Sequence, residues 1–254
     1  MKLTFLGTGT STGIPQIGCH CPVCTSIDPR DRRLRSSVIV ESGATRLLID
    51  CGPDFRQQIL RLDSPSLDAL LITHIHFDHV GGIDDLRPYC YRTGGFPIYC
   101  QDDVEADLRH NYPYCFAADH YPGAPVFGMH RLKAGATRDI AGVEITPLRV
   151  FHGRLPILGF RMGQLGYITD AKTLPLETIE SLRGVDTLVI NALRIQEHHT
   201  HMNLSQALDV INSVGCRQAY LTHISHDMGL HSSVELTLPQ GVYLAYDGLE
   251  ITIG

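Results

Sequence analysis

The sequence has 254 residues, of which 43% are hydrophobic and 19% charged, and its 21 basic and 27 acidic residues give a formal net charge of −6. These values exclude a disordered chain, and the acidic balance argues against a broad nucleic-acid-binding surface. No apolar run approaches the roughly 18 residues of a membrane span, and the first residues are too quickly broken by glycine for a secretion signal, so a cytoplasmic location is expected.

Predicted strands and helices alternate along the chain. In the first half, the spacing of apolar residues predicts strands at residues 2–7, 37–42, 46–52, 67–74 and 96–100, and helices at 54–62 and 102–112. In the second half it predicts strands at 142–152, 166–170, 185–193 and 217–223, helices at 175–183 and 203–215, and a closing hairpin over 242–254. This order predicts an α/β fold in which two similar halves pack as one sandwich, over a single domain of residues 1–254.

A dense group of thiols lies in the stretch GCHCPVC, residues 18–24. Eight cysteines without a secretion signal favour a reducing compartment, where clustered thiols bind metal rather than pair. A structural zinc site normally has four ligands, and Cys19, Cys21 and Cys24 supply three. His20 is a rival for the fourth position, but it lies between two of the cysteines and would have to turn back on itself. Local spacing alone therefore leaves the fourth ligand open between His20 and a residue elsewhere in the chain.

Four predicted strands end in a residue that can bind metal: His74, His152, Asp170 and His223. Strand ends that meet at one edge of a sheet are where α/β folds place ligand sites. The first of these residues opens the stretch HIHFDH. In an extended segment, residues two apart point to the same side, so His74 and His76 can bind one ion together. Two divalent metals need about six or seven N/O ligands with one bridge. The sequence supplies seven: His74, His76, Asp78, His79, His152, Asp170 and His223.

This pattern, H-x-H-x-D-H followed by Gly-Gly and then a spaced His, Asp and His, resembles the metallo-β-lactamase superfamily over almost the whole chain. The resemblance implies an αββα sandwich, two β-sheets flanked by helices, with a dinuclear site at one edge between the sheets. It also implies the distribution of the ligands, with Asp170 as the bridge. One metal would take His74, His76 and His152, and the other Asp78, His79 and His223. Asp50 matches a position that supports the site by orienting a ligating imidazole.

The cysteine cluster and the late stretch THISH together resemble the PhnP-like phosphodiesterases of carbon–phosphorus lyase pathways and, more distantly, tRNase Z. The resemblance implies a structural zinc held by Cys19, Cys21, Cys24 and His226. It further implies that a histidine just before the helix at 203–215, here His201, meets the scissile phosphate. The tRNase Z pattern has a Glu a few residues earlier. This chain has Asn191 nearby and no obvious equivalent, so no partner for a charge relay to His201 is predicted.

The resemblance predicts a metal-dependent phosphodiesterase, with small cyclic ribose or nucleotide phosphodiesters as the expected substrates. A hydroxide between two divalent ions, Mn or Zn, would attack phosphorus while Asp78 and Asp170 steer it, and His201 would protonate or stabilise the leaving oxygen. The alternatives are a tRNase Z-like RNA endonuclease, a thioester or lactone hydrolase of the same fold, and a non-enzymatic PqqB-like coenzyme-biosynthesis protein. Neither a membrane nor an extended nucleic acid is an expected partner, and a homodimer is compatible with the sequence.

Overall fold

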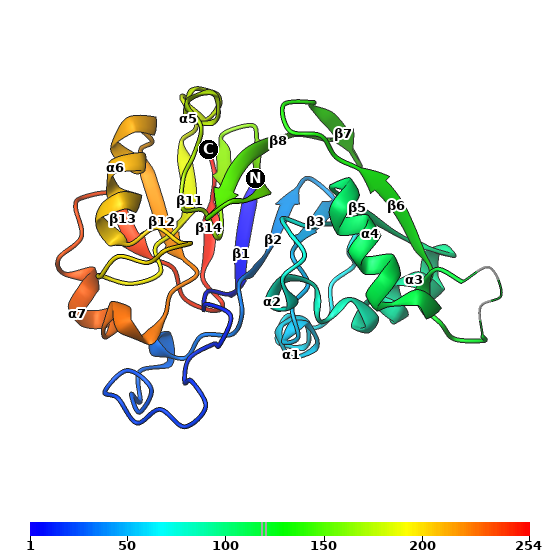
Figure 1. Ribbon diagram of the computed structural model, residues 1–254, viewed down its shortest axis with the longest axis horizontal. Helices are drawn as coiled ribbons and strands as arrows, with labels where there is room; N and C mark the ends of the chain where they lie inside the picture. Colours follow the sequence, from blue (N-terminus) through cyan, green and yellow to red (C-terminus); the bar gives the residue numbers. More distant parts are fainter. Residues whose placement is uncertain (118, 120) are drawn as a thin grey trace.

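Two seven-stranded β-sheets form the centre of the computed structural model, which describes residues 1–117, 119 and 121–254 (Figure 1). The first sheet orders its strands as β14 (Glu250–Thr252), β1 (Lys2–Gly7), β2 (Ser37–Ser42), β3 (Thr45–Ile49), β4 (Ala69–Leu71), β5 (Phe96–Cys100) and β6 (Phe127–Arg131). The second orders them as β13 (Val242–Leu244), β12 (Gln218–Thr222), β11 (Thr187–Asn191), β10 (Leu165–Tyr167), β9 (Leu155–Met162), β8 (Val143–His152) and β7 (Arg138–Ile140).

Helices cover the outer faces of both sheets. Those beside the first sheet are α1 (Phe55–Leu60), α2 (Phe77–Val80), α3 (Arg87–Thr93) and α4 (Asp102–Asn111). Those beside the second are α5 (Leu176–Leu182), α6 (Leu204–Val214) and α7 (His231–Glu235) (Figure 1). The predicted αββα sandwich is therefore confirmed. Among the residues that the structure describes, no helix combines the length and apolar character needed to cross a bilayer.

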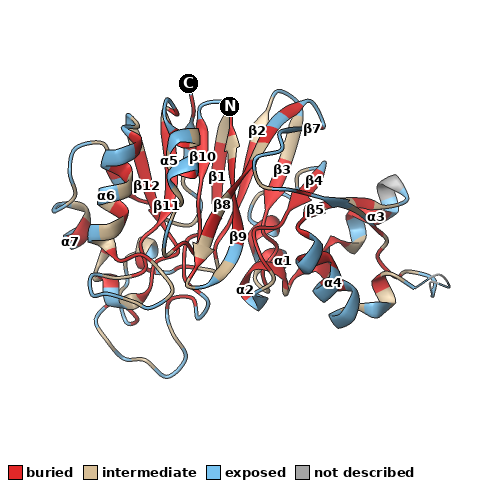
Figure 2. Cartoon of the chain, turned by 45° about the horizontal axis from the view of Figure 1, so that its top comes forward, coloured by how far each residue is buried: buried red, intermediate tan, exposed pale blue. Residues whose placement is uncertain are grey.

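The main core lies between the two sheets, because alternate strand residues point inward. Leu3 and Phe5 of β1 face this layer, where the Phe5 ring lies 6.1 Å from the ring of Tyr220 in the opposite sheet. Two further apolar clusters fill the spaces between each sheet and its helices. Figure 2 shows central strands such as β1, β11 and β12 as almost continuously buried, which explains the long apolar runs of their sequences.

Helix α6 has clear start and stop signals. The Asn203 side chain accepts from the Gln206 amide while the Gln206 side chain accepts from the Asn203 amide, and Gly215 ends the helix at φ 72°. Ala207, Ile211 and Val214 form its buried stripe. This capped start fixes the residues just before the helix, among them His201.

The predicted hairpin over 242–254 is wrong. β13 pairs with β12 in the second sheet, whereas β14 pairs with β1 in the first, so the chain crosses between sheets around Asp247. The Asp247 carboxylate accepts hydrogen bonds from the amide and hydroxyl of Thr8 and from the Leu34 amide. These distant partners, rather than a local turn, determine the path of the chain. The abundance of Pro, Gly and His over residues 117–133 predicts an irregular functional loop, but this segment contains β6; residues 118 and 120 within it lie outside the described residues.

Candidate metal centre

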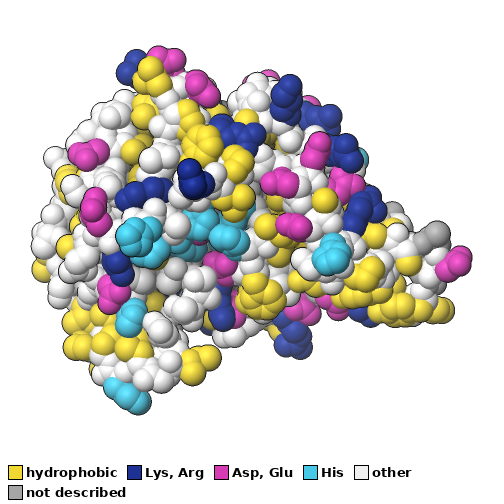
Figure 3. Space-filling model, viewed as in Figure 1, with side chains coloured by type: hydrophobic (Ala, Val, Ile, Leu, Met, Phe, Trp, Pro, Cys, Tyr) yellow, Lys and Arg dark blue, Asp and Glu magenta, His cyan; other side chains and the backbone are white. Residues whose placement is uncertain are grey.

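The predicted site residues gather at the edge of the sandwich where the segments after several strands meet. His152 is the last residue of β8, His223 directly follows β12, and Asp170 and His74 each follow within three residues of β10 and β4. Figure 3 shows histidine side chains clustered on this face, between the two halves of the molecule. The rule that strand ends converge therefore placed these residues correctly.

Three residues at this edge have a left-handed backbone conformation without being glycine. The φ angles are 61° at Asp50, 56° at Asp170 and 55° at His223. Such angles are uncommon for residues with a side chain, and they cluster at functional sites where the surrounding structure holds them. Each bend turns the side chain out of the strand direction and toward the cluster.

Helix α2 presents Asp78 and His79 to the cluster because glycines let it lie against the segment after β3. A Cβ added to Gly52 would lie 2.0 Å from the Asp78 carbonyl oxygen, and one added to Gly82 would lie 2.0 Å from the Gly52 oxygen. The Cys51 amide donates to the His79 oxygen at 2.7 Å. Neither glycine can gain a side chain without displacing the backbone that carries these two buried residues.

Four histidines of the cluster are oriented in the same way, each with Nδ1 bonded to a partner on the outside of the site. The pairs are His74 with Thr73 Oγ1 at 3.0 Å, His79 with Asp50 Oδ2 at 2.7 Å, His152 with the Thr200 carbonyl at 2.9 Å, and His223 with Ser36 Oγ at 3.3 Å. The Thr73 hydroxyl donates to Asp50 and the Ser36 hydroxyl to the Gly9 carbonyl, so both hydroxyls accept from the imidazoles. The Nε2 lone pairs of these histidines therefore point inward, as metal ligands require.

The inward face of His79 tests whether a cation fits. Its buried Nε2 has no hydrogen-bond partner among the residues that the structure describes, yet it lies 3.2 Å from Asp78 Oδ2 and 3.2 Å from Asp170 Oδ2. A lone pair facing two carboxylates is repulsive unless positive charge lies between them. Burial lowers the pKa of His79, but Asp170, Asp78 and Asp50 outweigh it and raise the pKa well above its usual value. The site thus favours positive charge, and its N/O donor set fits a divalent metal.

Asp170 is shared by two groups of potential ligands. Its Oδ1 lies 3.1 Å from His223 Nε2 and 3.1 Å from His201 Nε2, while Oδ2 faces His79. Donor atoms of Asp78, His79, Asp170 and His223 all lie within 4.8 Å of one another, and so do those of His152, Asp170 and His201. Burial raises the pKa of Asp170, but His223 and His79 outweigh it and hold the pKa well below the usual range. A carboxylate in this position suits the predicted bridge.

His74 and His76 lie beside these groups. His74 Nε2 and His76 Nδ1 are 3.0 Å apart, and the His76 ring is 5.0 Å from that of His152. His76 is exposed, whereas His74 is buried. The structure thus brings together all seven residues of the predicted set.

The three cysteines of residues 18–24 meet a histidine from the far end of the chain. His226 Nδ1 lies 3.3 Å from the sulfurs of Cys19 and Cys21 and 3.6 Å from that of Cys24. The Cys24 amide donates to the Cys21 sulfur and lowers the pKa of that thiol to about 6, which favours the metal-binding thiolate. His20 is exposed and lies outside the group. The arrangement suits tetrahedral zinc.

Several residues that orient the site were not predicted from the sequence. Ser36, Thr73 and Thr200 carry no motif that marks them, and only the fold places them behind a histidine. Asn191, noted as a neighbour of the His201 segment, has a different role. Its side chain accepts from the Ala171 amide and donates to the Ala171 oxygen, and so holds the chain just after Asp170.

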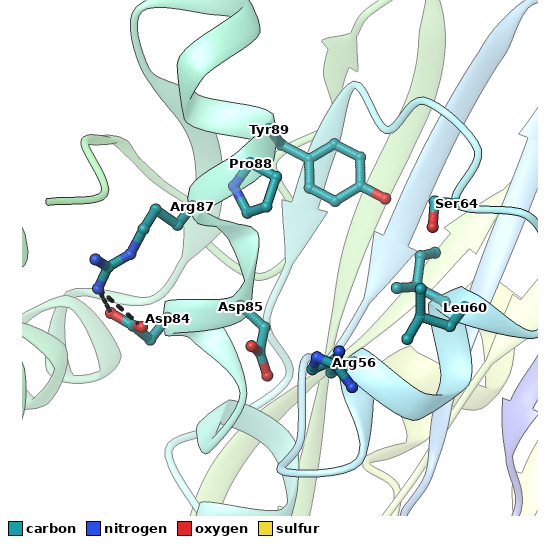
Figure 4. A pocket seen from close by; sticks show the side chains of 9 residues that line it. Arg56, Leu60, Ser64, Asp84, Asp85, Arg87, Pro88 and Tyr89 are labelled. Atoms are coloured by element: carbon teal, nitrogen blue, oxygen red, sulfur yellow. Dashed lines mark hydrogen bonds and ion pairs between the residues drawn. The ribbon is translucent and has the colours of Figure 1, made fainter. Parts of the chain in front are cut away.

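A separate cavity of about 330 Å³ lies between α1, α3 and the 3₁₀ helix Ile83–Leu86 (Figure 4). Leu60 and Tyr89 line it, together with the charged residues Arg56 and Asp85. None of the predicted metal ligands lines this cavity. The histidine cluster is therefore the candidate centre of the chemistry.

Comparison with known proteins agrees with this geometry. Residues 45–224 match the family described as the beta-lactamase superfamily domain. A solved structure described as a new diphosphatase from the PhnP family is 40% identical, covers 100% of this chain and 98% of that one, and superposes with a TM-score of 0.92. PqqB from Methylobacterium extorquens, at 22% identity and a TM-score of 0.78, shares the fold.

Two curated relatives differ in how much of their length is matched. A protein named octanoyltransferase from Porphyromonas gingivalis is 43% identical over 255 residues, which cover 100% of this chain but 52% of that protein. This chain thus spans about half the length of that relative. A ribonuclease Z from Mycobacterium bovis is 26% identical over 88% of this chain and 85% of its own length.

Proposed function

Because the chain belongs to the metallo-β-lactamase superfamily and, within it, to the PhnP family, we propose that this hydrolase cleaves small phosphodiesters with the help of bound divalent metal. The observation that carries the proposal is the contact of His201 Nε2 with Asp170 Oδ1 at 3.1 Å. It sets a potential proton donor directly beside the shared carboxylate of the cluster. Hydrolysis of a phosphodiester needs both groups, one for the attacking water and one for the leaving oxygen.

The residues would divide the work as follows. His74, His76 and His152 would hold one ion, Asp78, His79 and His223 the other, and Asp170 would contact both. When bound, two divalent ions, Mn or Zn, supply charge for the phosphoryl oxygens and lower the pKa of water. Asp78 and Asp170 would orient the attacking water, and one of these two carboxylates would accept its proton. His201 holds a proton at Nε2 for the leaving oxygen.

Cyclic ribose or nucleotide phosphates are the substrates we favour. The PhnP-family relative is described as a diphosphatase, and a diphosphate, like a diester, is cleaved at a bridging P–O bond. A second candidate is hydrolysis of an octanoyl thioester, favoured by the name of the 43% identical relative. This chain matches about half of that protein, so the name can equally describe its other half.

A substrate panel tests the proposed function. We expect turnover on bis-p-nitrophenyl phosphate and cyclic nucleotides to exceed turnover on p-nitrophenyl phosphate by at least about tenfold, or about 1.4 kcal/mol. The physical reason is that a terminal phosphate carries an additional negative charge next to Asp78 and Asp170. ADP and an octanoyl thioester complete the panel, each assayed with Mn and with Zn. Preference for the monoester, or hydrolysis of the thioester alone, would contradict the proposal.

We further propose a structural zinc on Cys19, Cys21, Cys24 and His226, which makes three ions per chain. Since His226 follows His223 by three residues, the two sites hold one short segment from both ends. Cys21→Ser should leave the protein folded, because the main core lies elsewhere. It should lower both the affinity for catalytic metal and the rate by about tenfold, because His223 would be positioned less rigidly.

Circular dichroism, metal titration and turnover on one preparation measure these effects of Cys21→Ser. Cys216→Ser is the matched control, since Cys216 lies outside the zinc group. Full activity of Cys21→Ser with one ion fewer would show that the cysteine site is independent of catalysis.

A further inference from the structure

The His201 ring is held at both of its nitrogens. Nε2 faces Asp170 Oδ1, while Nδ1 lies 3.1 Å from Nδ1 of His198 and 3.0 Å from the Thr200 hydroxyl oxygen. The sequence suggested no partner behind His201, because no carboxylate matched the Glu of the tRNase Z pattern. The structure places another imidazole there.

The hydrogen bonds determine which of the two facing nitrogens carries the proton. The Thr200 backbone amide, which can only donate, points to His198 Nδ1 at 3.4 Å. His198 Nδ1 therefore carries a lone pair, and the proton between the two rings belongs to His201 Nδ1. The Thr200 hydroxyl lies 3.3 Å from His198 Nδ1 and can relay the same bond, accepting from His201 and donating to His198. Both routes end on the His198 lone pair.

The surroundings of His198 suit an acceptor that stays neutral. The side chain is half-buried, and burial together with the charges of His201 and Arg194 lowers its pKa. The same short segment also orients a predicted metal ligand, since the Thr200 carbonyl accepts from His152 Nδ1 at 2.9 Å. Residues 198–201 thus connect the metal cluster with the leaving-group histidine.

We propose that His198 is a positioning residue for His201: by accepting the proton on His201 Nδ1, it fixes the ring angle at which the second proton, on Nε2, faces Asp170 and the leaving oxygen. The proposal rests on the proposed phosphodiesterase function. A neutral imidazole in this position accepts the hydrogen bond without adding negative charge beside an anionic substrate. His198 itself does not touch the reacting atoms.

Leaving-group dependence separates this role from a merely structural one. A proton donor matters most when the leaving oxygen is strongly basic, as in an alkyl ester, and little when it leaves readily, as p-nitrophenolate does. His198→Leu should therefore lower kcat about tenfold on a dialkyl or dinucleotide phosphodiester. On bis-p-nitrophenyl phosphate it should lower kcat less than about twofold. KM should change little, because the metal ligands are untouched.

Two further variants complete the design. His199→Leu is the matched control, because His199 is exposed and directly adjacent in sequence. His198→Asn keeps an acceptor near the position of Nδ1 and should restore most of the lost rate. Equal loss on both kinds of ester, or identical behaviour of His198→Leu and His199→Leu, would overturn the proposal while leaving the phosphodiesterase function intact.

A measurement without turnover tests the contact itself. Nitrogen-15 NMR of the imidazoles in the zinc-loaded protein should show His201 protonated at Nδ1 in the unmodified chain and in His199→Leu. That signal should shift or disappear in His198→Leu and return in His198→Asn. If the unmodified protein cleaves no phosphodiester, the proposed function fails. The NMR result tests the positioning role even then: an unchanged His201 Nδ1 signal in His198→Leu would overturn it.

Discussion

Asp170→Ala is expected to lower phosphodiester turnover by about 10³-fold or more, equivalent to about 4 kcal/mol of transition-state stabilisation. Asp170 faces three histidines, with its two oxygens 3.1–3.2 Å from His79, His201 and His223. Its removal would take away the carboxylate common to both groups of ligands and leave the buried imidazoles to repel one another when charged.

Metal content by elemental analysis and turnover on bis-p-nitrophenyl phosphate would measure this effect. Asp209→Ala is a suitable control, because Asp209 is an exposed aspartate on α6. We expect Asp170→Ala to bind less catalytic metal than the unmodified chain, whereas Asp209→Ala should match it in both measurements. An Asp170→Ala protein with full metal content and normal turnover would contradict the shared-ligand role.

His201→Ala is expected to lower turnover by about 10²-fold, the usual loss when a positioned proton donor is removed, and to leave the metal content unchanged. The second half of this statement decides the role of the residue. His201 lies within reach of His152 and Asp170, in a group that could itself hold an ion. Loss of metal together with activity would identify His201 as a ligand, and the assignment as proton donor would be wrong.

The sequence predicted the parts of the fold that depend on local patterns. The bounds of β1, β2 and β5 agree with the predicted strands, because each is an apolar run ended by a turn or a helix start. The strand-end rule also placed His74, His152, Asp170 and His223 together. Their convergence follows from the shared direction of the strands: β10 and β12 are both parallel to β11, and β9 is antiparallel to both β8 and β10.

Features that depend on distant contacts were not predictable. An Asp-Gly pair favours a hairpin, but Asp247 bonds to Thr8 and Leu34, which no local pattern reveals. The role of His198 depends on the path of an irregular segment, where neither helical nor strand periodicity applies. His226 was found only through a family resemblance, because two hundred residues separate it from the cysteines it faces.

The pairing of β14 with β1, which joins Lys2 to Thr252, has a consequence for synthesis of the protein. Synthesis from the N-terminus presents β1 long before β14, so this edge of β1 stays open until residues 250–252 have emerged from the ribosome. The thiols of Cys19, Cys21 and Cys24 likewise remain without their histidine partner until His226 has been synthesised. We expect the nascent chain to be most exposed to aggregation and oxidation during this interval, and to gain both protections once residues 226–252 have emerged.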